Sequence, residues 1–232
     1  MRAPSGKVDE LVFLLDVDNT LLDNDRITAD MHGMLEREVG KERADQYFDI
    51  FEQLRVELGY ADYLGALQQY RNVHPRDPHV LYLSHLLIDY PFANRLYPES
   101  LDVIDRLKSW GAAVILSDGD VVFQPRKVQR SGLWSAVESK VLIYVHKEQQ
   151  LDDVADRFPA SHYVLVDDKL RVLSAVKGAW RDRVTTVFPR QGHYAHDPKI
   201  LAEYPPADIT VSRIGELLEF ERSAFVPKSP QS

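Results

Sequence analysis

The chain has 232 residues, of which 44% are hydrophobic and 28% are charged, and this composition is typical of an ordinary soluble globular protein. Its 28 basic and 36 acidic side chains give a formal net charge of -8, and no basic stripe offsets that charge, so a nucleic-acid partner is not expected. The chain has no cysteine, which excludes disulfides, thiolate zinc sites and cysteine nucleophiles.

The apolar run nearest the N-terminus is short. It covers residues 11–15 and ends at Asp16, so it cannot form the core of a signal peptide. No segment approaches the roughly 20 apolar residues that span a membrane. The sequence therefore predicts a cytoplasmic protein without a membrane partner, and it leaves the oligomeric state open.

Six short apolar runs predict β-strands. Most of them are continuous rather than alternating, and β-branched residues are common in them. Such runs are typical of strands that are buried on both faces of a parallel sheet. The predicted strands are residues 11–15, 112–116, 141–144, 163–166, 184–188 and, more weakly, 209–211.

Helical patterns lie between these strands. Residues 98–110 place Leu101, Ile104 and Leu107 on one stripe, and Gly111 follows as a helix stop. The alternation predicts a doubly wound α/β fold. Further helices are predicted at residues 147–158, at 169–177 before Gly178, and at 212–220 with Ser212 as N-cap, whereas the ends, residues 1–10 and 227–232, carry no pattern.

One long stretch departs from the alternation. From Asn24 to Leu96 the sequence shows helical periodicity and no convincing strand. Turn-forming residues flank the stretch, at 23–25 on entry and at 91–98 on exit, where a hinge is expected. We therefore predict an α/β core of residues 1–23 and 97–232 and an all-helical insert of residues 24–96.

Four carboxylates follow two of the predicted strands. Asp16 ends the first strand and Asp18 lies two residues further on, while Asp167 and Asp168 follow the strand at 163–166. Ligands of open α/β sheets bind outside the carboxyl ends of the strands, so these acids are expected at one edge. Four carboxylates held together need a divalent cation, and ligands that are all oxygen suit Mg²⁺.

Two more strand ends supply groups that suit an anion. Ser117, Asp118 and Gly119 follow the strand at 112–116, where a hydroxyl and the amide of a glycine form a phosphate cradle. Lys147 follows the strand at 141–144 at the start of a predicted helix. A helix dipole disfavours a cation there, so this lysine indicates an anionic partner.

In order, these groups resemble the four motifs of the haloacid dehalogenase superfamily. The resemblance covers about residue 10 to residue 220, and the helical insert falls between the first and second motifs, where members of the superfamily carry a cap. It implies that Asp16 is the nucleophile that forms an aspartyl-phosphate, and that Asp18 protonates the leaving group and then activates water. It also implies that Asp16, the backbone carbonyl of Asp18 and the Asp167–Asp168 pair hold Mg²⁺, and that the cradle of Ser117, Asp118 and Gly119 and the side chain of Lys147 bind the phosphate.

The chain departs from the superfamily pattern at two places. Asp118 stands where asparagine is common, and Asp120 adds a further negative charge near a site for an anion. Val172 stands where the longer form of the last motif has a carboxylate, so the pattern leaves open which of Asp167 and Asp168 contacts the metal.

The favoured interpretation is a Mg²⁺-dependent phosphatase that acts on a small phosphorylated metabolite. Superfamily members that dehalogenate carbon lack the second acid, so Asp18 favours phosphate chemistry. Alternatives on the same fold are a phosphomutase or other phosphotransferase, and a catalytically silent binding protein. A glycosyltransferase with an Asp-x-Asp motif would leave Asp167 and Asp168 unexplained, and phosphoryl-accepting receivers are about half as long.

Other polar residues receive no role. Arg55, Arg71, His74 and Arg95 in or near the insert are interpreted as surface residues. His193 and His196 are interpreted as part of a loop at the rim of the site rather than as a metal pair.

Overall fold

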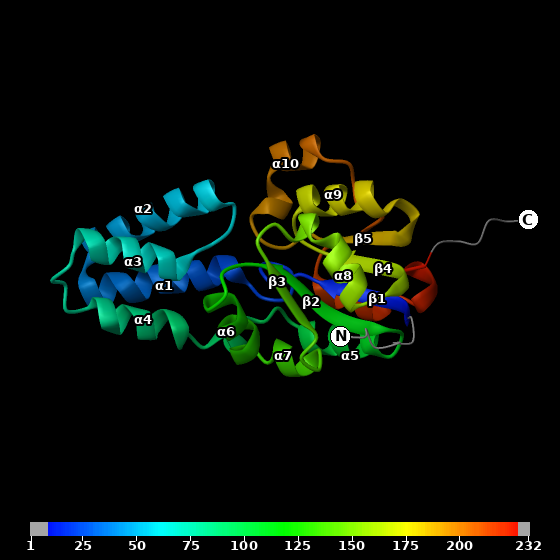
Figure 1. Ribbon diagram of the computed structural model, residues 1–232, viewed down its shortest axis with the longest axis horizontal. Helices are drawn as coiled ribbons and strands as arrows, with labels where there is room; N and C mark the ends of the chain where they lie inside the picture. Colours follow the sequence, from blue (N-terminus) through cyan, green and yellow to red (C-terminus); the bar gives the residue numbers. More distant parts are fainter. Residues whose placement is uncertain (1–8, 227–232) are drawn as a thin grey trace, which may run out of the picture.

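The computed structural model describes residues 9–226, which form a parallel β-sheet with helices on both faces and a group of helices at one end (Figure 1). The sheet has six strands in the order β3-β2-β1-β4-β5-β6, and every pair is parallel. This arrangement confirms the predicted α/β fold. The strands are β1 (Asp9–Leu15), β2 (Ala112–Asp118), β3 (Val141–Tyr144), β4 (Ala160–Val166), β5 (Val184–Pro189) and β6 (Ile209–Val211).

All six predicted strands are present, and β3 and β6 have the predicted bounds. β2 continues two residues further than expected, so Ser117 and Asp118 are its last residues. Residues 9 and 10, expected to lack structure, belong to β1. The rest of the two ends, residues 1–8 and 227–232, lies outside the described part of the chain.

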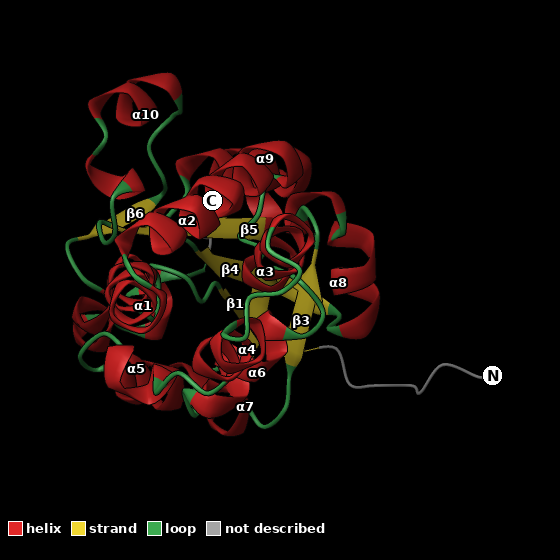
Figure 2. Cartoon of the chain, turned by 90° about the vertical axis from the view of Figure 1, so that its left-hand side faces the viewer, coloured by secondary structure: helices red, strands yellow, loops and turns green. Residues whose placement is uncertain are grey.

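Side chains of the central strand alternate between two hydrophobic clusters. Leu11, Phe13 and Leu15 pack in the cluster under α5 (Ser100–Lys108), whereas Val12 and Leu14 pack in the cluster under α9 (Leu170–Trp180). Figure 2 shows α8 and α9 on one side of the sheet and α5, α6 and α7 on the other. The remaining helices of this part are α6 (Phe123–Arg130), α7 (Leu133–Ala136) and α8 (Leu151–Arg157).

Several predicted helices differ in extent. α9 continues through Gly178 to Trp180 because the Trp180 ring stacks on Tyr163, with centroids 4.2 Å apart. The segment at 147–158 divides into the 3₁₀ turn η2 (Lys147–Gln149) and α8. The segment at 212–220 is a 3₁₀ helix, η5 (Ile214–Glu219), and Ser212 does not cap it. Beyond β5 lie η4 (Tyr194–His196) and α10 (Pro198–Glu203), which were not predicted.

From Asn24 to η1 (Phe92–Arg95) helices are the only regular elements, as predicted. The chain enters and leaves this insert side by side, because the N–H of Asp23 donates to the carbonyl of Arg95 at 2.8 Å and the N–H of Tyr97 to that of Leu21 at 3.0 Å. Asp23 also caps the first helix through its carboxylate. The insert helices are α1 (Asn24–Val39), α2 (Lys41–Leu58), α3 (Tyr63–Val73) and α4 (Val80–Ile88).

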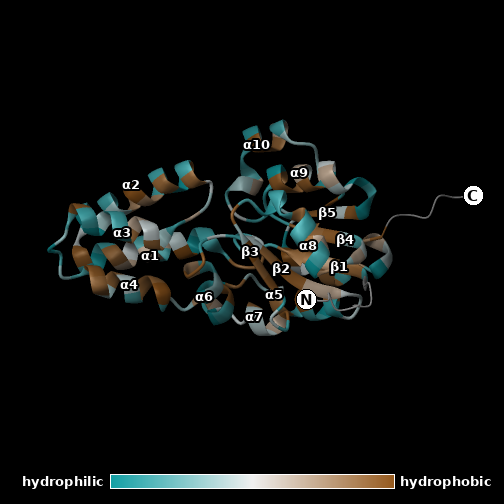
Figure 3. Cartoon of the chain, in the orientation of Figure 1, coloured by the Kyte–Doolittle hydropathy of each residue, from teal (hydrophilic) through white to brown (hydrophobic). Residues whose placement is uncertain are grey.

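An aromatic column connects the insert to the sheet. Phe51 stacks on Tyr63 with centroids 4.4 Å apart, and Tyr63 lies 4.7 Å from Phe123 at the start of α6. Phe92 contacts the same Phe123 ring edge-on. The insert and one face of the sheet therefore share one hydrophobic cluster. Figure 3 shows that α4 of the insert is largely hydrophobic, and Leu81 of this helix is exposed. No helix within residues 9–226 has the length and apolarity that crossing a membrane requires.

Candidate active site

The carboxyl ends of four neighbouring strands meet at one edge of the sheet. Leu15 pairs with Ile115 of β2 and with Val166 of β4, so Asp16 and Asp167 begin at the same level. Ser117 pairs with Ile143 of β3, which brings the segment carrying Lys147 to the same edge. The parallel register thus brings together acids and a lysine that are distant in sequence.

Lys147 lies at the centre of this edge. Its ammonium nitrogen is 2.5 Å from Oδ1 of Asp16 and 2.7 Å from Oδ2 of Asp167, and it donates to the carbonyl of Leu116 at 3.2 Å. The side chain is only 2% exposed, so solvent does not screen these interactions. Burial lowers the pKa of Lys147, but the carboxylates of Asp16 and Asp167 outweigh burial and the net shift is upward. This lysine is therefore positively charged.

Three buried aspartates form a group with the properties of a metal site. Carboxylate oxygens of Asp16, Asp167 and Asp168 all lie within 4.8 Å of one another. Both side-chain oxygens of Asp168 are buried without a hydrogen-bond partner among the described residues, while its backbone N–H donates to Thr20 Oγ1. Burial raises the pKa of Asp16 to about 7 and that of Asp168 well above its usual range. Such uncompensated oxygens fit a hard divalent cation.

The side chain of Asp18 lies apart from this group and has its own partners. Lys127 of α6 donates to Asp18 Oδ1 at 2.7 Å, and Gln124 of the same helix donates to Oδ2 at 3.2 Å. Lys127 also donates to the side chain of Asn24, at the first position of α1. Lys127 and Gln124 were not among the predicted site residues, yet both are buried.

The groups of the phosphate cradle predicted after β2 already have hydrogen-bond partners within the protein. Ser117 Oγ is buried and accepts a hydrogen bond from Gln124 at 2.9 Å. Asp118 Oδ1 accepts from the backbone N–H of Lys147 at 2.7 Å, which positions the lysine segment. The N–H of Gly119 donates to the carbonyl of Tyr144. Contrary to the expectation, this amide is therefore not free to bind a phosphate. A Cβ at Gly119 would lie 2.6 Å from Cβ of Gln124, which explains the glycine by close packing.

A segment after β5 forms the other side of the site and contacts the insert. His193 Nδ1 lies 2.7 Å from Oδ1 of Asp25 in α1, and Arg55 of α2 donates to the hydroxyl of Tyr194 at 2.5 Å. The rim position proposed for His193 therefore agrees with the structure. Arg55, interpreted as a surface residue, instead connects the insert to the core.

Lys169 lies between the acid group and this rim. It follows Asp168 directly, is half-buried, and its ammonium nitrogen is 5.7 Å from the centre of the Tyr194 ring. Burial lowers its pKa, but the carboxylates of Asp168, Asp16 and Asp167 give a net upward shift. The site thus holds a second charged lysine beside Lys147.

Comparison with known protein families identifies the family to which this chain belongs. A model described as haloacid dehalogenase-like hydrolase matches residues 11–179. The chain belongs to this family of hydrolases, which confirms the resemblance seen in the sequence.

Solved structures agree with the family. A haloacid dehalogenase-like hydrolase from Burkholderia xenovorans LB400 is 59% identical, with a TM-score of 0.89 over 93% of this chain and 98% of that one. The magnesium-bound HAD hydrolase YfnB of Bacillus subtilis is 16% identical, with a TM-score of 0.59 over 92% and 98% of the two chains. The L-2-haloacid dehalogenase of Xanthobacter autotrophicus is 17% identical, with a TM-score of 0.58 over 90% and 97%. The latter two show the fold alone, and a search of curated proteins found no match.

Proposed function

We propose that the protein is a Mg²⁺-dependent phosphatase that hydrolyses a small phosphomonoester through an aspartyl-phosphate on Asp16. The observation that carries the proposal is the placement of Asp18, a second acid two residues after Asp16, whose carboxylate Lys127 and Gln124 hold in one orientation. Displacement at phosphorus needs such an acid to protonate the leaving oxygen.

In the first step, a carboxylate oxygen of Asp16 attacks phosphorus. The ester P–O bond breaks, and the leaving oxygen takes a proton from Asp18, so an alcohol departs. Lys147 and Ser117 bind the equatorial phosphoryl oxygens, where charge is concentrated in the transition state. Lys147 suits this task because it is buried and already fixed by Asp16 and Asp167.

In the second step, water attacks the phosphorus of the aspartyl-phosphate. Asp18, now ionised, accepts a proton from this water, and the bond between phosphorus and Asp16 breaks to release inorganic phosphate. Asp16, Asp167 and Asp168 would hold Mg²⁺, with the backbone carbonyl of Asp18 as the further ligand inferred from the family. When bound, Mg²⁺ neutralises phosphoryl charge and keeps the anionic substrate compatible with the carboxylates.

Dehalogenation is the competing reaction, because some structural neighbours are haloacid dehalogenases. In that reaction a halide leaves, and a halide needs no proton. A positioned acid at Asp18 would then have no role. The fixed orientation of Asp18 therefore favours phosphate transfer over dehalogenation. A phosphomutase would use the same first step but return the phosphoryl group to an organic acceptor.

The test measures phosphate and chloride release by the purified protein. We expect Mg²⁺-dependent phosphate release from 4-nitrophenyl phosphate and no chloride release from chloroacetate. Asp16→Asn should lower turnover to below about one ten-thousandth, since an amide cannot form the acyl-phosphate, and Asp18→Asn should also be severe. Chloride release with no phosphate release would replace the phosphatase by a dehalogenase, and transfer of phosphate to an added alcohol without its release would favour a mutase.

A further inference from the structure

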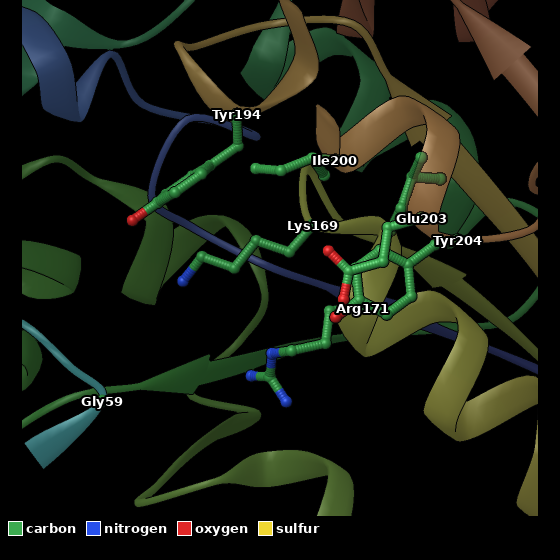
Figure 4. Close-up of a pocket in the computed structure, with 8 residues that line it drawn as sticks. Gly59, Lys169, Arg171, Tyr194, Ile200, Glu203 and Tyr204 are labelled. Carbon is green, nitrogen blue, oxygen red and sulfur yellow. The ribbon is translucent and has the colours of Figure 1, made fainter. Parts of the chain in front are cut away.

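A cavity of about 210 Å³ lies beside the acid group, between the core and the helical insert. Lys169 and Arg171 at the start of α9 line one wall, Tyr194 and Glu203 of the segment after β5 line another, and Gly59 of the insert closes it. In Figure 4 the side chains of Lys169, Arg171 and Tyr194 extend to the same side, toward the chain segment that carries Gly59. The cavity is therefore walled by both parts of the protein.

Two contacts connect this cavity to the reacting groups. Lys169 follows Asp168 of the acid group directly. Gly59 lies so close to His146, the neighbour of Lys147, that a Cβ at position 59 would be 2.8 Å from its ring. The cavity therefore adjoins both the acid group and the segment that carries Lys147.

The charged side chains that line the cavity differ in how far other groups compensate their charges. The ammonium group of Lys169 makes no direct ion pair within residues 9–226, although the carboxylates of the acid group act on it at longer range and the ring face of Tyr194 lies beside it. Arg171 is paired with the buried carboxylate of Glu148 at 2.5 Å, so its charge is largely compensated. Glu203 is exposed at the rim, where solvent screens its charge. Lys169 is thus the one cation of this cavity without a direct partner, and Mg²⁺ bound to the acid group would compensate the carboxylates that act on it.

We infer that this cavity binds the leaving-group portion of the substrate and that this portion carries a carboxylate, which Lys169 and Arg171 bind. The inference rests on the proposed phosphatase function. A carboxylate brings one negative charge to the one cation without a direct partner, and Arg171, whose Nη1 is paired with Glu148, adds its remaining N–H groups. The volume is below that of sites for drug-sized ligands, which indicates a short organic acid rather than a nucleoside.

The kinetic test compares esters of equal chain length. Carboxyethyl phosphate, hydroxypropyl phosphate and propanediol bisphosphate are assayed with Mg²⁺ for the parent protein and for Lys169→Met, Lys169→Arg and Lys199→Met. We expect the parent to prefer the carboxylate ester by about tenfold in kcat/KM, because hydrogen bonds to a charged group have that strength. Lys169→Met should abolish this preference, Lys169→Arg should retain it, and Lys199→Met, which changes an exposed lysine outside the cavity, should leave it unchanged.

A binding test separates this inference from the proposed function. Phosphonopropionate and hydroxypropylphosphonate cannot be hydrolysed, so their affinities for the parent with Mg²⁺, measured by calorimetry, do not depend on turnover. Tighter binding of phosphonopropionate that Lys169→Met removes, in a protein that hydrolyses neither ester, would end the phosphatase proposal and support the carboxylate site. Equal affinities together with equal ester kinetics would overturn the carboxylate site, as would a bisphosphate preferred over the carboxylate ester.

Discussion

The ammonium group of Lys127 lies 2.7 Å from Oδ1 of Asp18, although 109 residues separate the two in the sequence. The lysine side chain is 1% exposed and the aspartate 21%, so the pair lies at the boundary between core and solvent. Gln124 links the same carboxylate to Ser117. The orientation of the proposed acid is therefore set by α6, the helix that follows the second motif.

Replacing Lys127 should lower turnover more than substrate binding. In Lys127→Met the apolar volume is kept but Asp18 loses its fixed partner, so we expect kcat to fall about ten- to a hundredfold with KM little changed. Steady-state kinetics with an aryl phosphate measure this. Lys140→Met is the control, because Lys140 precedes β3 at the opposite edge of the sheet and pairs with Glu138. Equal kinetics in the two variants would show that Asp18 needs no partner.

The buried acids predict how Mg²⁺ and pH act on stability. Because burial raises the pKa of Asp16 to about 7 and that of Asp168 well above its usual range, the metal-free folded protein retains protons that the unfolded chain has released. The contribution of these two acids to the free energy of unfolding therefore falls as the pH rises from about 4 to 7. Mg²⁺ takes the place of these protons, so it should raise Tm more at about pH 7.5 than at about pH 5.5.

The variant Asp168→Asn tests the same point in thermal unfolding. It removes one buried acid, so at neutral pH the metal-free variant should be more stable than the metal-free parent, and Mg²⁺ should raise its Tm less. Asp45→Asn, which changes a half-exposed acid on α2, is the control. A Mg²⁺ effect of the same size in parent and Asp168→Asn would exclude Asp168 from the metal site.

At Gly59 the insert lies very close to the core, and this contact can be tested by substitution. Its φ of 78° is unfavourable for other residues, and a Cβ there would meet His146. Gly59→Ala should therefore lose about 1 kcal/mol of stability from the backbone and, in addition, activity. Gly132 has a φ of 88° with open space around it, so Gly132→Ala should lose similar stability and keep full activity. Activity that falls equally in both variants would mean that the contact with His146 has no role.

Removal of the insert should weaken discrimination between substrates, because the cavity then loses the wall that Gly59 forms. Replacing residues 25–92 by a short Gly/Ser linker is geometrically simple, because the backbones of Asp23 and Arg95 are already hydrogen-bonded. The shared aromatic column means that Phe123 would lose Tyr63 and Phe92, so the shortened protein also needs Phe123→Ser and should have a lower Tm. We expect the ratio of kcat/KM values for the best metabolite and for an aryl phosphate to fall. An unchanged ratio in a folded protein would show that the insert contributes nothing to specificity.

The strand ends are the part of the site that the sequence predicts well. Apolar runs end at Asp16, Ser117 and Asp167, and parallel strands deliver their carboxyl ends to one edge whatever the details of the helices. Lys127 and Gln124 could not be found in this way, because no helix was predicted at residues 123–130 and the partners of both residues lie far away in sequence. A signal was present, since the two residues are three apart and share the buried side of the helix with Phe123 and Val128.

The rim of the site is less predictable for the same reason. The segment of Gln191, His193 and Tyr194 takes its position from Thr20, Asp25 and Arg55, all far away in sequence. The extension of α9 past Gly178 likewise depends on Tyr163, a residue of the neighbouring strand. The secondary-structure propensity of a local segment contains no information on such distant partners.

The pairing of β1 with β4 has a consequence for synthesis of the chain. Leu15 lies beside Val166, so the residues that complete the acid group leave the ribosome long after Asp16. The helices of the insert contact their sequence neighbours and form early, whereas β1 must wait for distant strands, and such non-local pairing is slow. The catalytic edge is therefore absent during most of the translation of the chain. During refolding, the return of activity measures the pairing of β1 with β4.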